Sequence, residues 1–152
     1  MTRVEKYVNK IRHLLANKDV LEVACGTADF TIKSSEYTHR AYCIDLENHR
    51  INPDLYEKSN ASFQIMDASN MTFADDSFDV VIIYNALGHL KHVLEKVMQE
   101  CLRVKKADGL VIIIASWGLD KMAIEENLIP HLENNYITFT RDDEKDAVFL
   151  YV

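Results

Sequence analysis

The sequence predicts an α/β protein built on a doubly wound, mostly parallel sheet with helices on both faces. Helix-like and strand-like segments alternate along most of the 152 residues. Five strand-like segments precede the last two, and those that are fully apolar, such as LVIIIAS, are typical of strands that are covered on both faces. Only the charged stretch RDDEKD separates the last two strand-like segments, and so short a connection allows only an antiparallel hairpin.

The first half of the chain supplies one clear helix and three strands. Apolar residues recur every three or four positions over residues 4–15, the pattern of an amphipathic helix. The runs VLEVAC, RAYCID and SFQIMD are predicted strands, and TADFTIKSSEY, between the first two, is predicted to be a helix of low propensity. The polar stretch before the third strand contains Pro53, which disfavours a long helix there.

The second half continues the alternation. FDVVIIYNA is a fourth predicted strand, and residues 90–104 keep a helical period that ends near the turn sequence KKADG. LVIIIAS is a fifth strand, residues 119–135 form a helix interrupted or ended by Pro130, and YITFT and AVFLYV are the hairpin strands. Because no repeat or linker is present, we expect a single domain over residues 1–152.

Composition narrows the classes of function. The net charge of −7 argues against a nucleic-acid partner, which needs clustered Lys and Arg. No apolar run approaches the roughly 18 residues that span a bilayer, so no membrane association is expected. Three separated cysteines without C-x-x-C spacing indicate neither disulfides nor zinc, and His89 and His92 lack a third ligand, so we expect a cytoplasmic protein with reduced thiols and no metal.

Polar side chains follow four of the predicted strands. Glu22, Asp45 and Asp67 stand at or just beyond the ends of the first three, and Asn85 follows the fourth. In a doubly wound sheet the ligand binds outside the carboxyl ends of the strands, so these residues are candidates for one site. Asp45 lies about 20 residues after Gly26, an interval that places a carboxylate against ribose hydroxyls in nucleotide-binding folds.

The turn after the first strand does not fit a dinucleotide. The fingerprint G-x-G-x-x-G would require three glycines, whereas this chain has Ala24, Gly26 and Asp29 at those positions. An aspartate at the start of the following helix would repel a pyrophosphate. Nicotinamide and flavin dinucleotides are therefore disfavoured.

The successive segments VLEVACGTADF, CIDLE, IMDASNMTFADDSFDVVIIYNALGHL and ECLRVKKADGLVIIIAS resemble, in order, the motifs of the class I S-adenosylmethionine-dependent methyltransferases, in particular the small type-11-like members. The resemblance runs from about Val20 to Ser116. It implies a seven-stranded sheet of order 3-2-1-4-5-7-6 with the last strand antiparallel, and S-adenosylmethionine as the cofactor. The [DN]-P-P-[YFW] tetrapeptide of nucleic-acid amino-methyltransferases is absent, because NALG stands at that strand end.

The resemblance also implies which residues bind the cofactor. Glu22 would lie near the methionine ammonium, Asp45 would accept from the ribose hydroxyls, and Asp67 would accept from the adenine amine. The remaining implied contacts come from the turns beside these residues and from the end of the fourth strand, and they are Ala24, Cys25, Gly26, Thr27, Leu46, Ala68, Asn85 and Ala86. The family motif has glycine where Ala24 and Ala28 stand, and we expect both alanines at negative φ, where glycine would lower stability slightly.

These observations predict methyl transfer from S-adenosylmethionine to a small-molecule or otherwise unidentified acceptor, by a monomer or homodimer. His89 is a weak candidate for a base or a substrate contact, with a helix-starting polar residue as the alternative. We expect the mouth of the acceptor pocket to be bordered by the amino-terminal helix, residues 85–89, Ser116 and Trp117. Trp117 is either a wall of that pocket or a packing residue at the sheet edge. The alternative function is a non-catalytic regulatory module that binds S-adenosylmethionine or S-adenosylhomocysteine.

Overall fold

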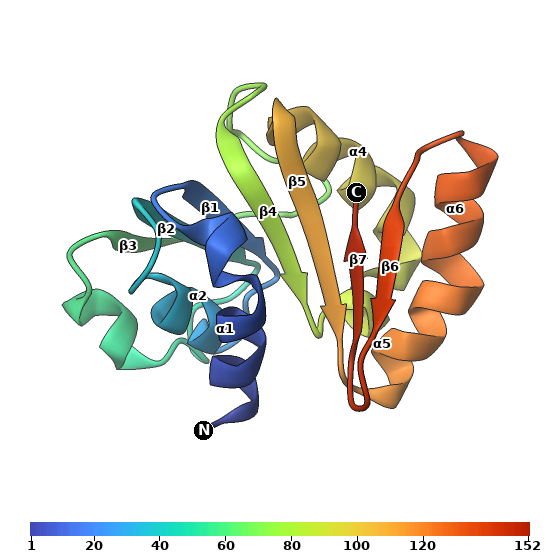
Figure 1. Cartoon of the computed structure of the whole chain (residues 1–152). Coiled ribbons are helices and arrows are strands. Elements are labelled where there is room, and N and C mark those ends of the chain that lie inside the picture. The colour runs from blue at the N-terminus through green and yellow to red at the C-terminus, as the bar shows by residue number, and fades with distance from the viewer.

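The computed structural model describes all residues 1–152, and it contains a seven-stranded sheet of order β3-β2-β1-β4-β5-β7-β6 (Figure 1). The neighbouring strands β3, β2, β1, β4 and β5 run parallel to one another, and β7 is antiparallel to its two neighbours, β5 and β6. This arrangement confirms the predicted fold class and strand order. The strand bounds are β1 Asp19–Val23, β2 Arg40–Asp45, β3 Ala61–Ile65, β4 Phe78–Tyr84, β5 Lys105–Ala115, β6 Thr140–Asp143 and β7 Val148–Tyr151.

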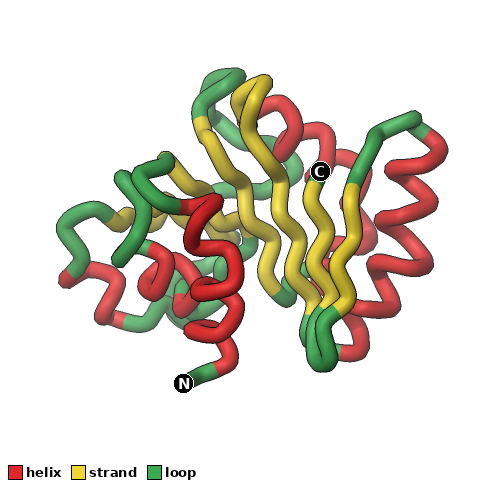
Figure 2. Tube along the Cα trace, viewed as in Figure 1, coloured by secondary structure: helices red, strands yellow, loops and turns green.

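Helices cover both faces of the sheet, as Figure 2 shows in red against the yellow strands. The α-helices are α1 Arg3–Leu15, α2 Asp29–Ser34, α3 Leu87–Leu90, α4 Leu94–Val104, α5 Gly118–Ala123 and α6 Ile129–Asn134. Three further helical segments are η1 Pro53–Glu57 and η2 Lys91–Val93, both 3₁₀, and η3 Ile124–Leu128, a π-helix. None of these helices combines the length and apolar character needed to cross a bilayer.

Side chains alternate between the two faces of the central strands, and each helix packs against one face of the sheet. Val80 and Ile82 of β4 pack with apolar residues of α1 and with Phe30 of α2. Val81 and Ile83, which point the opposite way, pack with α4 and with the segment from α5 to α6. Since both faces of β4 are buried, the strand must be apolar at every position that the helices cover.

The start of β5 differs from the expectation. The predicted turn KKADG belongs to the strand, which pairs with β4 first at Lys105 and then, after a register shift, at Leu110. Gly109 permits this close approach, because a Cβ there would lie 2.5 Å from the carbonyl oxygen of Asp79. Helix α4 therefore runs directly into the strand without an intervening turn.

In the last third of the chain, the structure selects one of the two alternatives for Pro130 and moves the start of one predicted strand. The helix is interrupted rather than ended at Pro130, since a π-helical segment immediately precedes α6 and the proline stands in its first turn. Strand β6 begins at Thr140, so most of the segment YITFT lies outside the sheet and part of RDDEKD is inside it. The pairing of Thr140 with Tyr151 fixes this register, and the local pattern of side chains could not reveal it.

Candidate functional site

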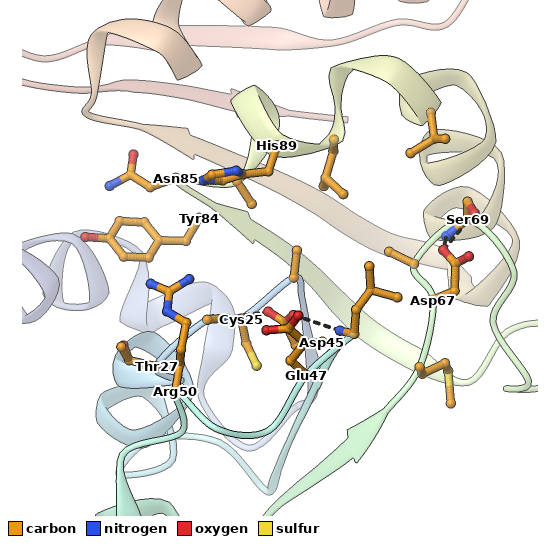
Figure 3. Close-up of a pocket in the computed structure, with 18 of the residues that line it drawn as sticks. Cys25, Thr27, Asp45, Glu47, Arg50, Asp67, Ser69, Tyr84, Asn85 and His89 are labelled. Carbon is orange, nitrogen blue, oxygen red and sulfur yellow. Dashed lines mark hydrogen bonds between the residues drawn. The ribbon is translucent and has the colours of Figure 1, made fainter.

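A cavity of about 430 Å³ lies at the carboxyl ends of the parallel strands (Figure 3). It is formed by the turns that follow β1, β2 and β3 and by the residues that follow β4, where the strand order reverses. Ten of the eleven residues implied as cofactor contacts line it, namely Ala24, Cys25, Gly26, Thr27, Asp45, Leu46, Asp67, Ala68, Asn85 and Ala86. The tertiary structure therefore brings these separate segments together in one place.

Asp45 links the end of β2 to the turn after β1. Its Oδ2 accepts a hydrogen bond from the Gly26 N–H at 2.8 Å, and its Oδ1 accepts from the Leu46 N–H at 2.7 Å. Each carboxylate oxygen can accept a further bond, so hydroxyl donors in the cavity could still be bound. Asp45 consequently has a structural role in the turn as well as its predicted role towards a ligand.

Asp67 closes a tight turn at the end of β3. Its Oδ1 accepts from the Ser69 hydroxyl at 2.7 Å and from the Ser69 N–H at 2.8 Å. These two bonds, led by the hydroxyl, lower the pKa of the Asp67 carboxyl below its ordinary value. The side chain is therefore held as an anion, and its Oδ2 makes no hydrogen bond within the chain.

The turn between β1 and α2 has a strained backbone. The values of φ are +52° at Ala24, +58° at Gly26 and +66° at Ala28, so the expectation of negative φ at the two alanines is wrong. The Gly26 N–H bonds to Asp45 and the Ala28 N–H donates to the Cys25 carbonyl at 2.9 Å, and these bonds hold the turn. Both alanines therefore stand in a region of φ that glycine adopts at lower cost.

Glu22 is the one implied cofactor contact that does not line the cavity. Only 2% of its surface is exposed, and its Oε1 accepts from the Thr31 hydroxyl at 2.6 Å and from the Thr31 N–H at 3.1 Å. Burial raises the pKa of this carboxyl to about 8 in spite of those bonds. The side chain thus ties β1 to α2, and its place towards a ligand stays a prediction.

The end of β4 is cross-linked to the end of β5. The Asn85 side chain donates to the Ser116 hydroxyl at 2.7 Å and accepts from the Ser116 N–H at the same distance. Its backbone has φ of +47°, a value that asparagine tolerates better than most residues. Tyr84 packs on Phe30 and also lines the cavity, and burial raises the pKa of its phenol to about 12.

One end of the cavity is open, and its border differs in part from the expected one. His89 and Trp117 line it as expected, and the tryptophan keeps 53% of its surface exposed. No residue of α1 lines the cavity, although we expected that helix at the mouth. Leu90 and Val93 form that part of the wall instead, because α3 and η2 project over the strand ends.

Sequence reasoning missed Arg50 and Glu47, which also line the cavity. Both stand in the polar stretch between β2 and η1, which has no hydrophobic period to predict its path. The Asn52 N–H donates to the Thr27 carbonyl at 2.9 Å and so brings this stretch back to the turn after β1. No local pattern identifies that contact, because it joins residues from two separate turns.

Comparison with known proteins identifies the class of protein to which this chain is similar. A family model described as a methyltransferase domain matches residues 21–113. Ajmaline N-methyltransferase of Rauvolfia serpentina is 25% identical over 127 residues, which cover 76% of this chain and 42% of that protein. A demethylmenaquinone methyltransferase of Staphylococcus epidermidis is 30% identical over 115 residues, 72% of this chain and 47% of that protein.

The fold comparison agrees with the family. A crystal structure of a S-adenosylmethionine-dependent methyltransferase from Aquifex aeolicus superposes with a TM-score of 0.77 at 19% identity, over 97% of this chain and 87% of that one. The fold is that of the class I S-adenosylmethionine-dependent methyltransferases. The chain belongs to the methyltransferase domain family. It spans less than half the length of the two sequence relatives, at 42% and 47%.

The side chains that line the cavity suit S-adenosylmethionine, the cofactor that this family implies. The adenosine part offers hydroxyl and amine donors, and Asp45 and Asp67 present carboxylate oxygens to the cavity from adjacent strands. The site has no cluster of three or more metal-ligating side chains. The chemistry of the lining therefore matches a neutral nucleoside that carries hydroxyl groups better than it matches a phosphorylated one.

Proposed function

We propose that this chain binds S-adenosylmethionine in the cavity and transfers its methyl group to a small-molecule acceptor. The observation that carries the proposal is the pair of carboxylates, Asp45 and Asp67, that face one cavity beside a glycine turn at the switch point of the sheet. In this assignment Asp45 accepts from the ribose hydroxyls and Asp67 accepts from the adenine amine. The backbone around Gly26 lies beneath the middle of the ligand.

The order of the lining residues supports one orientation of the ligand. In Figure 3, Asp67 and Ser69 lie on one side of the cavity, Asp45 lies near the middle, and Tyr84 and Asn85 lie on the other side. Adenine beside Asp67 and ribose beside Asp45 would place the methionine part near Asn85. The methyl group would then face the open end, where His89 and Trp117 stand.

The bound cofactor supplies a methyl group already activated by a sulfonium. When bound, it would give this methyl carbon to a lone pair of the acceptor, with the electron pair of the broken carbon–sulfur bond left on sulfur. The protein mainly has to hold the acceptor in line, which is a positioning task. An acceptor that must lose a proton could give it to His89, which lines the cavity, or to water.

The lining of the open end favours an acceptor with an aromatic or apolar body. Trp117, Leu90 and Val93 offer apolar surface, and His89 adds one polar group. The relatives named above are methyltransferases of ajmaline and of demethylmenaquinone, both small molecules. The net charge of −7 agrees with such an acceptor and not with a nucleic acid.

Calorimetric titration followed by an acceptor screen tests this function. We expect S-adenosylmethionine and S-adenosylhomocysteine to bind, NAD not to bind, and mass spectrometry to detect a methylated product with at least one ring-containing amine, phenol or quinol. Absence of binding by both adenosyl ligands would refute the proposal. Tight binding without any product across the screen would favour the non-catalytic regulatory module.

A further inference from the structure

Arg50 is a cation without a partner at the wall of the cavity. It is the only Lys or Arg among the lining residues, and it takes part in no hydrogen bond or ion pair in the chain, although three carboxylates line the same cavity. Glu47 is close to His49, at 3.1 Å, and the oxygens of Asp45 bond to backbone N–H groups. The guanidinium donors of Arg50 are therefore available to a ligand.

The guanidinium lies directly over the turn that follows β1. A Cβ placed on Gly26 would be 3.7 Å from both Nη1 and Nη2 of Arg50, so the side chain passes over the glycine at van der Waals distance. Figure 3 shows it pointing toward the side of the cavity where Tyr84 lies, away from Asp67. In the orientation proposed above, this is the methionine side of the ligand.

The amino-acid end of the cofactor carries a carboxylate, and the backbone nearby offers few donors for it. The N–H groups of Cys25, Gly26 and Ala28 are already bonded to Ile44, Asp45 and Cys25 respectively. Helix α2 is only six residues long and has an aspartate, Asp29, at its first position, so its N-terminus would not attract an anion. Of residues 25–28 only Thr27 has an N–H without a partner, so a carboxylate bound here would take its further donors from side chains.

We propose that Arg50 binds the carboxylate of the methionine part of S-adenosylmethionine and so makes the site select adenosyl ligands that carry this group. The planar guanidinium can donate two parallel hydrogen bonds to one carboxylate. It also offsets the negative charge of Asp45, Glu47 and Asp67, which would otherwise oppose an anionic group in the cavity. This inference rests on the proposed function, since it assigns one more contact of the same ligand.

The test compares two ligands that differ only in the carboxylate, S-adenosylmethionine and decarboxylated S-adenosylmethionine, by titration calorimetry. We expect Arg50→Gln to weaken binding of the carboxylated ligand by at least about tenfold, the effect of losing one charge-assisted hydrogen bond, and to leave the affinity for the decarboxylated ligand within about twofold. Arg50→Lys keeps the charge but loses the paired geometry. Its affinity for the carboxylated ligand should therefore lie between those of the wild type and of Arg50→Gln.

The matched control is Arg40→Gln, which removes the same charge from an exposed position at the opposite end of β2 and should change neither affinity. Equal weakening of both ligands by Arg50→Gln, or no weakening of either, would overturn the assignment of Arg50 while leaving the cofactor site in place. Failure of both ligands to bind the wild-type protein would refute the proposed function itself, and the assignment of Arg50 with it.

Discussion

Replacement of Ala24 by glycine should stabilise the protein, because the backbone of the turn after β1 is already in a conformation that favours glycine. Ala24 has φ of +52° and Ala28 has φ of +66°, both in the left-handed region. The two positions differ in their surroundings. Ala24 is partly exposed at the cavity wall, whereas Ala28 is fully buried beside Cys25 and Cys43.

Three contributions determine how much each glycine substitution changes the free energy of unfolding. The left-handed region costs an L-residue about 1–2 kcal/mol, and glycine is spared that cost. Glycine in turn gives the unfolded chain more freedom, which lowers the free energy of unfolding by about 0.4–1 kcal/mol. At position 24 the difference favours glycine by about 0.5–1 kcal/mol. At position 28 the loss of a buried methyl group costs about 0.8 kcal/mol more, so the net change there is about zero.

Thermal and urea unfolding of the two variants measure these changes, and Ala16→Gly is the control. Ala16 is exposed and has φ of −59°, so glycine there should lower stability by about 0.4–1 kcal/mol. For a chain of this size, Ala24→Gly should raise Tm by about 1–4 °C. If Ala24→Gly lowered stability as much as Ala16→Gly does, the positive φ at position 24 would be wrong.

Three further predictions concern the cavity and the strand beneath it. Asp45→Asn should weaken binding of S-adenosylhomocysteine by about 1.5–3 kcal/mol, measured by calorimetry, because one charged acceptor is lost, and an unchanged affinity would contradict the ribose assignment. Trp117→Ala should reduce the rate of methyl transfer far more than it reduces cofactor affinity, and equal losses would contradict an acceptor wall. For Glu22, the folded-state pKa of about 8 lies above the unfolded value, so the folded state binds more protons between about pH 4.5 and 8 and the wild type loses stability as the pH rises. The loss is up to about 1.4 kcal/mol per pH unit, and Glu22→Gln should abolish it in urea unfolding at pH 5 and pH 8, whereas equal slopes in both proteins would show that Glu22 ionises normally.

The choice of asparagine at position 45 follows from the contacts of the half-buried Asp45 carboxylate. The structure shows that the Gly26 N–H also depends on Asp45, so Asp45→Ala would leave that donor unpaired and loosen the turn. Asparagine keeps one acceptor oxygen at the same position, and it therefore separates the effect on binding from the effect on the turn better than alanine does.

The sequence by itself determined the fold class, the strand order through its family resemblance, and the segments that meet at the site. The parallel strands are rich in apolar residues, even in the largely exposed edge strand β3, and they end in polar turns. For this reason β1 to β4 and their terminal residues, Asp45, Asp67 and Asn85 among them, can be located from local pattern alone. The carboxyl ends of parallel strands share one edge, which is why these residues line one cavity.

Only the tertiary structure decided the sign of φ at Ala24 and Ala28, the burial of Glu22 and the position of Arg50. Each depends on a contact between segments that are distant in sequence or that belong to different elements. The turn after β1 is set by its bond to Asp45, Glu22 is covered once α2 packs on β1, and Arg50 reaches Gly26 because the stretch after β2 folds back onto the turn. Local periodicity records which face of an element is buried, and it contains no information about which neighbouring turn supplies the partner.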